Sequence, residues 1–224
     1  MSEKDIKAVM QDTKDVDTSN EFGGMIVGET KAPFRDPERG GGQTRIATLK
    51  YPWNHVVTAY CSRFPTNDQY FPYIKKTEIL EHKEEGDTVS ETRRVSIDPG
   101  MPGWLKTLTR LHYFTFVEKS FIDYKKKIMK LDTEMESLST YANVLEDCTY
   151  SQDPENPEWT KKEQTAYCKI NVWVPFGYQD SIEGYGSWIF TERAKDALRQ
   201  EKNLIENIIA NGGKYTPSNK TDEI

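Results

Sequence analysis

The chain has 224 residues, enough for one sizeable domain with a buried core and further chain at its ends. Its formal net charge of −6 argues against a general nucleic-acid-binding protein, because neutralising phosphates requires a basic face. No stretch reaches the apolar length of a transmembrane helix, and the acidic N-terminal sequence has the pattern of neither a secretory signal nor a mitochondrial presequence.

Residues 1–43 are polar and contain the cluster Gly40-Gly41-Gly42, so we expect a flexible N-terminal tail there. A phosphate-binding loop is disfavoured because no Gly-Lys-Ser/Thr follows the glycines. The folded domain is then expected over residues 44–213, and a second polar, disordered tail over residues 214–224.

A short helix is predicted between Pro52 and Pro65. Pro52 suits the first turn of a helix, where its missing N–H costs nothing, and Pro65 prevents the helix from continuing. The apolar residues at helical spacing are Val56, Val57, Tyr60 and Phe64. They predict one buried face, and they place Arg63 at the C-terminal end of this helix.

Most of the remaining chain reads as strands followed by one long helix. The strand-like segments are Arg45–Lys50, Tyr73–Lys83, Thr88–Asp98, His112–Tyr124, Ile128–Leu138, Tyr141–Ser151 and Thr160–Val172. A helix is predicted from about residue 180 to residue 211, with Gly212-Gly213 as its stop. This order predicts an α+β fold in which a curved antiparallel sheet of about six to seven strands and a long C-terminal helix form a cup for an apolar ligand.

Catalytic and metal-binding motifs are lacking. The three histidines, His55, His82 and His112, show neither HExxH nor zinc-finger spacing, and no G-x-S-x-G or Cys–His signature is present. The three cysteines, Cys61, Cys148 and Cys168, are expected to be buried thiols, with a facing Cys148–Cys168 pair as the alternative. We therefore expect no enzyme activity, no metal and no cofactor.

Several motifs, taken in order, resemble the PRELI/MSF1 domain family. They are Tyr51-Pro52-Trp53, Ala59…Arg63-Phe64-Pro65, Glu91-Thr92-Arg93-Arg94, Pro102…Trp104 and Pro157-Glu158-Trp159-Thr160. The resemblance covers residues 46–211 and is specific through the order and spacing of the motifs. The elements around Arg63 and Trp159 look most like the variant found in CRAL-TRIO/GOLD lipid-binding proteins.

This resemblance implies a START- or phosphatidylinositol-transfer-like cup with a lid. Mitochondrial members carry phosphatidic acid or phosphatidylserine across the intermembrane space and work with a small twin-CX9C protein. The resemblance therefore implies a phospholipid ligand, a transient peripheral contact with a membrane surface and a possible twin-CX9C partner. It places the protein in the mitochondrial intermembrane space, with the cytoplasm as the alternative.

The resemblance also implies headgroup-binding residues. Arg63 matches the arginine at the bottom of the family's pocket, and arginine binds phosphate in bidentate fashion. Arg93 and Arg94 are adjacent on a strand, so at most one of them faces the cup. Lys195 lies near the family's basic helix positions. The alternatives are an Arg63 that interacts with its own helix end and a Lys195 on a solvated helix face.

The segment Pro102–Leu111 matches the family's lid. Its apolar side chains include Trp104, which suits a membrane interface. Its basic side chains would contact anionic lipid. The predicted membrane-contact residues are Trp104, Leu105, Lys106, Leu108 and Arg110. The alternative is a segment that simply packs over the mouth of the sheet.

The sequence thus predicts an intracellular protein that binds phospholipids and transfers them between membranes. Positions that carry lysines in the phosphatidic-acid carriers align at or near Ile97, Ile189 and Asp196, so the headgroup stays open. The same departures motivate an alternative of another class, a protein-interaction or regulatory module that keeps the fold without transferring lipid.

Overall fold

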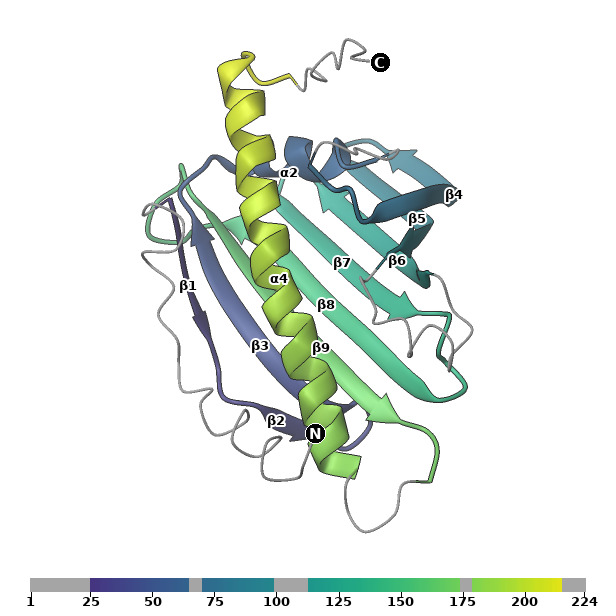
Figure 1. The fold of residues 1–224 in the computed structure, drawn as a ribbon. Helices are drawn as coiled ribbons and strands as arrows, with labels where there is room; N and C mark the ends of the chain where they lie inside the picture. Colours follow the sequence, from purple (N-terminus) through teal and green to yellow (C-terminus); the bar gives the residue numbers. More distant parts are fainter. Residues whose placement is uncertain (1–24, 65–69, 99–112, 174–178, 215–224) are drawn as a thin grey trace, which may run out of the picture.

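The computed structural model describes residues 25–64, 70–98, 113–173 and 179–214, and within residues 179–195 it describes few side chains. Figure 1 shows a curved sheet crossed by one long helix. The strands are β1 (Ile26–Thr30), β2 (Phe34–Asp36), β3 (Gly40–Leu49), β4 (Ile74–Glu85), β5 (Thr88–Ile97), β6 (Phe114–Asp123), β7 (Ile128–Met135), β8 (Ala142–Gln152) and β9 (Thr160–Ile170). The described helices are α2 (Trp53–Cys61) and α4 (Gln179–Ala210).

All the pairings in this sheet are antiparallel. The nine strands follow the order β1-β3-β9-β8-β7-β6-β5-β4, with β2 also paired to β3. The prediction of a curved antiparallel sheet with a long C-terminal helix is therefore confirmed. The sheet stays open, because β1 and β4 are its two ends along this path and they do not pair with each other.

The predicted N-terminal tail is wrong for residues 26–43. These residues form β1, β2 and the start of β3, and they add two strands to the seven that the sequence indicated. The glycine cluster serves close packing: a Cβ at Gly40 would collide with the carbonyl oxygen of Cys168, and Gly40 has a φ of +88°. At Gly42 a Cβ would meet the ring of Phe34. Residues 1–24 and 215–224 lie outside the described part of the chain.

The core lies between the sheet and the two helices. We call the side of the sheet that carries α2 and α4 the inner face. Helix α4 packs against β3, β9 and α2, so its packing is concentrated toward one side of the sheet (Figure 1). Fully buried side chains come from both layers, among them Ile26, Leu49, Val56, Tyr60, Met129, Tyr150, Leu198, Leu204, Ile205 and Ile208. Burial of such side chains against the sheet stabilises the helices at about 1.5–3 kcal/mol each.

The cysteines are all free thiols. Cys148 and Cys168 are buried, as expected, whereas Cys61 is exposed. The alternative of a facing pair is wrong, because Cys148 lies opposite Gln164 and Cys168 lies opposite Val144 in the β8–β9 register. Neither described helix is long and apolar enough to cross a membrane. Within the same residues, no three histidine, cysteine or acidic side chains gather as a metal site would require.

Candidate functional site

A row of polar residues crosses the inner face of the sheet. Arg93 of β5 lies opposite Glu118 of β6, which lies opposite Thr133 of β7, which in turn lies opposite Glu146 of β8. Residues that pair directly across antiparallel strands point to the same face. The register therefore brings one arginine and two carboxylates from distant parts of the sequence onto one line between the sheet and the helices.

Arg63 approaches this row from the end of α2. The helix ends after Cys61, and the Arg63 amide donates to the Tyr60 carbonyl at 3.1 Å, which holds the turn close to the helix. The guanidinium lies over the Tyr60 ring, 4.4 Å from its centroid, and 5.7 Å from the centroid of Phe71. Such stacking suits arginine, whose planar cation is weakly hydrated.

The charge of Arg63 is balanced by nearby carboxylates. Burial lowers the pKa of Arg63, but the negative charges of Glu118 and Glu201 outweigh this effect and hold that pKa above its usual value. The Nε atom of Arg63 is buried and has no hydrogen-bond partner among the described residues. Buried donors are normally paired, so this atom marks a place where a ligand acceptor would fit.

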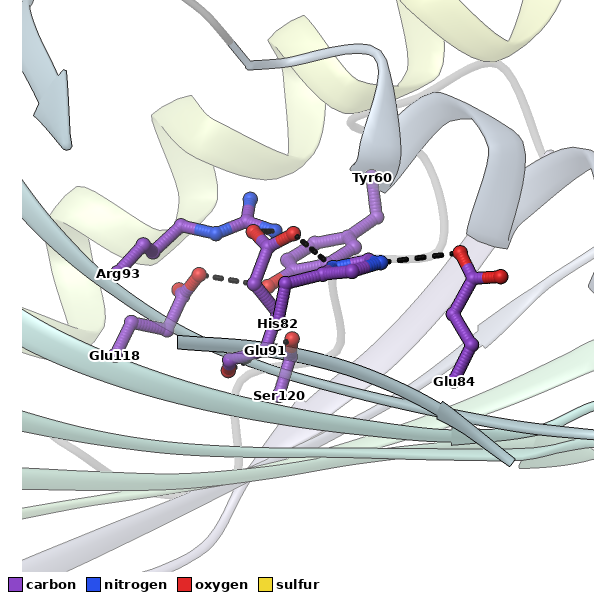
Figure 2. A network of polar contacts seen from close by, with 7 residues as sticks. All are labelled: Tyr60, His82, Glu84, Glu91, Arg93, Glu118 and Ser120. Carbon is purple, nitrogen blue, oxygen red and sulfur yellow. Dashed lines mark hydrogen bonds and ion pairs between the residues drawn. The ribbon is translucent and has the colours of Figure 1, made fainter. Parts of the chain in front are cut away.

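Arg93 shares the aromatic rings that surround Arg63. Its side chain is 7% exposed, its guanidinium lies 3.9 Å from the centroid of Phe64, and it forms an ion pair with Glu91 (Figure 2). Two further nitrogen atoms of Arg93, Nε and Nη1, are buried without a hydrogen-bond partner among the described residues. The two arginines thus present unused donors from the same cluster of rings.

Tyr60 connects these arginines to the row of carboxylates. Its hydroxyl donates to Glu118 Oε1 at 2.6 Å (Figure 2). Burial raises the pKa of Tyr60 well above its usual value, and the charge of Glu118 raises it further. The phenol therefore stays protonated, so it serves as a fixed donor that orients Glu118 beside Arg93.

Lys162 and Glu201 form a second charged group on the inner face. Lys162 Nζ of β9 lies 3.1 Å from Glu201 Oε2 of α4, and both side chains are less than one tenth exposed. The Tyr150 hydroxyl donates to the same Glu201 oxygen at 3.4 Å. A buried ion pair of this kind ties the helix to the sheet, because separating it would leave an unpaired buried charge.

Glu146 has an unusual environment at the β8 end of the row. Gln164 Nε2 donates to Glu146 Oε1 at 2.7 Å. Burial raises the pKa of Glu146 to about 7, and the neighbouring charge of Glu118 adds to this effect, while Lys162 opposes it. A carboxyl group with such a pKa exchanges its proton near neutral pH.

His82 lies at the outer end of the arginine cluster, on the end strand β4. Its Nδ1 atom is 3.0 Å from Glu91 and its Nε2 atom is 3.0 Å from Glu84 (Figure 2). Hydrogen bonds to Glu84 and Glu91 raise the pKa of His82, so this exposed imidazole favours its charged form beside the Arg93–Glu91 pair.

The structure separates the predicted headgroup residues. Arg63 and Arg93 come together, but Arg94 lies on the outer face, where it binds Glu136 through Nε at 2.9 Å. Successive residues of a strand alternate between faces, so Arg94 cannot join its neighbour in the candidate site. Lys195 lies within α4, and its side chain is not among those described. The predicted lid residues, 102–111, lie outside the described residues.

Sequence reasoning missed the carboxylates of this site and the buried lysine on β9. Glu118, Glu146 and Lys162 sit at alternating positions of long strands, a pattern that is typical of a solvated face. The available signal was the spacing of two residues along each strand. Glu118 is two residues from Phe116 and Glu146 is two residues from Cys148, and both of these apolar side chains are buried on the inner face.

The chain is similar in sequence to several curated proteins. It is 30% identical to Protein real-time of Drosophila melanogaster over 152 residues, which are 67% of this chain and 23% of that protein. It is 29% identical to the slowmo homolog of Dictyostelium discoideum over 62% of this chain and 59% of that protein. It is 26% identical to PRELI domain-containing protein 1, mitochondrial, of Gallus gallus over 63% of this chain and 65% of that protein. The chain spans about a quarter of the length of the real-time proteins that it matches.

Solved structures show the same fold at low sequence identity. The Zhui aromatase/cyclase of Streptomyces sp. R1128 is 13% identical, with a TM-score of 0.54 over 78% of this chain and 98% of that one. At this identity the likeness concerns the fold alone. The model of the PRELI-like family matches residues 54–211, which include α2, β4 to β9 and α4. This chain therefore belongs to the PRELI-like family.

Proposed function

We propose that this protein binds a phospholipid on the inner face of its sheet and transfers it between membranes. Membership of the PRELI-like family supports lipid binding. The observation that carries the proposal is the pair Arg63 and Arg93, which share one cluster of aromatic rings and hold three buried, unpaired guanidinium nitrogens among the described residues.

The chemistry of these two arginines suits a phosphate. Guanidinium groups bind phosphate oxygens through paired N–H donors, and the interaction strengthens where water is excluded. Apolar side chains flank the arginines on the same face, including Val95 beside Arg93 on β5 and Phe116 beside Glu118 on β6. Acyl chains gain about 0.8 kcal/mol per buried CH₂ group, so an apolar surface next to a phosphate site would supply much of the affinity.

Transfer of a fluorescent phospholipid between vesicles would test the role of Arg63. We expect Arg63→Ala to lower the transfer rate about tenfold to a hundredfold, because a charged hydrogen bond contributes about 1.5–3 kcal/mol. Arg63→Lys keeps the charge without the planar fork, so we expect an intermediate rate. Thermal unfolding of each variant establishes that the fold is retained.

Arg94→Ala is the matched control. Arg94 has the same side chain one residue from Arg93, yet it lies on the outer face in exposed pairs with Glu136 and Glu78. Removing an exposed pair changes stability by less than about 1 kcal/mol, so we expect the Arg94→Ala protein to stay folded. Because Arg94 lies on the outer face, away from the candidate site, we expect unchanged transfer. Equal losses in Arg63→Ala and Arg94→Ala, with both folds intact, would contradict a headgroup role for Arg63.

The alternative function, a protein-interaction module that retains the fold, gives a different result. Native mass spectrometry of the purified protein would then show no bound glycerophospholipid, vesicles would exchange no lipid, and a stable protein complex would form. A bound glycerophospholipid at one copy per chain supports the carrier instead.

The proposal extends to location and partners. The Gallus gallus relative is named as mitochondrial, which supports the intermembrane space for this chain, with the cytoplasm as the alternative. We propose a small twin-CX9C protein as its partner there, membrane contact through residues 104–110, and no enzymatic activity or cofactor. Subcellular fractionation of cells with the tagged chain distinguishes the two compartments.

A further inference from the structure

On the inner face, acidic side chains accompany the basic ones around the proposed headgroup site. The basic residues among those described are Arg45, Arg63, Arg93 and Lys162. The acidic ones are Glu91, Glu118, Glu146 and Glu201. A further buried acid, Glu183, is paired with Arg35 at 2.7 Å. Carboxylates therefore neighbour both headgroup arginines before any ligand binds.

These carboxylates disfavour a strongly anionic headgroup. Phosphatidic acid has a phosphate monoester that carries between one and two negative charges near neutral pH. Such a group on Arg63 and Arg93 would place its charge close to Glu91 and Glu118, the carboxylates that already neighbour these arginines. An uncompensated charge in a partly buried setting is costly. A zwitterionic headgroup adds no net charge and avoids this cost.

Unpaired acceptors accompany the unpaired donors. The buried oxygens Glu201 Oε1 and Gln164 Oε1 have no hydrogen-bond partner among the described residues, just as Arg63 Nε has none. A phosphate can satisfy only the donors, because a diester phosphate has no proton to give. A ligand that also carries N–H donors would satisfy both kinds of atom.

The row of carboxylates gives the position of such a donor. Glu118 lies directly opposite Arg93, and Glu146 lies two strands beyond Glu118, about 10 Å away between Cα atoms at the usual strand spacing. The two glutamate side chains point to the same face from either side of Thr133. Gln164 holds Glu146 in place through its amide, while its own oxygen stays unpaired.

We propose that the preferred ligand is a phospholipid whose headgroup joins a phosphate to a primary ammonium and carries no net charge, as in phosphatidylethanolamine. Its phosphate lies on Arg63 and Arg93, and its ammonium lies between Glu118 and Glu146. This inference rests on the proposed function and adds the headgroup class. A choline headgroup has no N–H donor, and the rings of Tyr60, Phe64 and Tyr150 already lie against arginine or lysine side chains.

Competition among headgroups tests the inference. The full chain is incubated with vesicles that contain equal amounts of phosphatidylethanolamine, phosphatidylcholine, phosphatidylserine and phosphatidic acid, and is then re-isolated. Mass spectrometry of the extracted lipid gives the bound share of each headgroup. We expect phosphatidylethanolamine to be enriched about tenfold over each of the others, which corresponds to about 1.4 kcal/mol.

The variant Glu146→Gln tests whether the negative charge of Glu146 selects the headgroup. It keeps the shape of the side chain and an oxygen for the Gln164 amide but removes the negative charge. We expect it to lose the enrichment of phosphatidylethanolamine and to raise the bound share of phosphatidic acid. Glu163→Gln, on the exposed outer face of β9, should leave the lipid profile unchanged.

The outcomes separate this inference from the proposed function. A wild-type protein that mainly binds phosphatidic acid, or that takes up phosphatidylcholine equally well, overturns the ammonium site but keeps the lipid carrier. One that mainly binds phosphatidylserine overturns the preference for a headgroup without net charge. A folded Glu146→Gln protein with the wild-type profile also overturns it. Binding of none of the four lipids overturns the proposed function itself. If Glu146→Gln does not fold, the wild-type profile alone decides.

Discussion

Glu146 links protonation to folding at the scale of a single residue. Its carboxyl has a pKa of about 7 in the folded chain, against an ordinary value of 4.5, chiefly because it is buried. Between these two values the folded chain binds more protons than the unfolded chain. The free energy of unfolding therefore falls as pH rises through this window, by up to roughly 3 kcal/mol.

Urea unfolding across about pH 5 to about pH 8 measures this effect. Stability should be highest at the acidic end and decline as pH passes the folded pKa of Glu146. His82 contributes in the same direction, because its pKa is raised by Glu84 and Glu91 and its stabilising charge is lost at higher pH. The difference between the wild-type chain and Glu146→Gln isolates Glu146, and identical pH profiles for the two would contradict the prediction.

At the scale of helices and strands, the contact between β9 and α4 depends on the Lys162–Glu201 pair. Helix α4 reaches the sheet through apolar side chains and through buried polar contacts, of which this pair holds the helix over Tyr150. Removing one partner leaves a buried charge without compensation. We expect Lys162→Ala to lower the free energy of unfolding by about 3–5 kcal/mol.

Two further variants separate loss of the pair from loss of a lysine. Lys161→Ala removes the neighbouring lysine, which lies on the outer face, and should change the free energy of unfolding by less than about 0.5 kcal/mol. Replacing both Lys162 and Glu201 by Met removes both charges together and should restore most of the stability. A Lys162→Ala loss no larger than that of Lys161→Ala, by urea unfolding, would show that the pair does not hold the helix.

At the scale of the whole molecule, local sequence patterns predicted the helices and most strands. Pairing between distant segments decided the strand order and which residues meet in the candidate site. Helices α2 and α4 could be predicted because proline, glycine and the spacing of apolar residues mark helix ends and faces within a few residues. The pairing of Gly41 with Cys168 could not be predicted, since it joins segments far apart in the chain. For the same reason Arg63 was found through a motif, whereas its neighbour Glu118 appears only once β5 and β6 are aligned with α2.

The glycine-rich start of β3 shows how composition misleads. Polar residues and three consecutive glycines normally indicate a flexible linker, and here they indicate strands packed too closely for side chains. Residues 26–36 contribute β1 and β2, which cover one edge of β3, and Ile26 is fully buried in the core. The folded domain therefore includes β1 and β2, which lie before the boundary that the sequence suggested.

Truncation tests this boundary. A chain that begins at Gly40 lacks β1 and β2, so β3 would expose unpaired backbone groups along one edge and the core would lose Ile26. We expect its free energy of unfolding to fall by at least about 2 kcal/mol relative to a chain that begins at Met25, which keeps both strands. An exposed strand edge also promotes association, so size-exclusion chromatography with light scattering should show oligomers of the shorter chain. If both chains are monomeric and equally stable, β1 and β2 are not part of the folded domain.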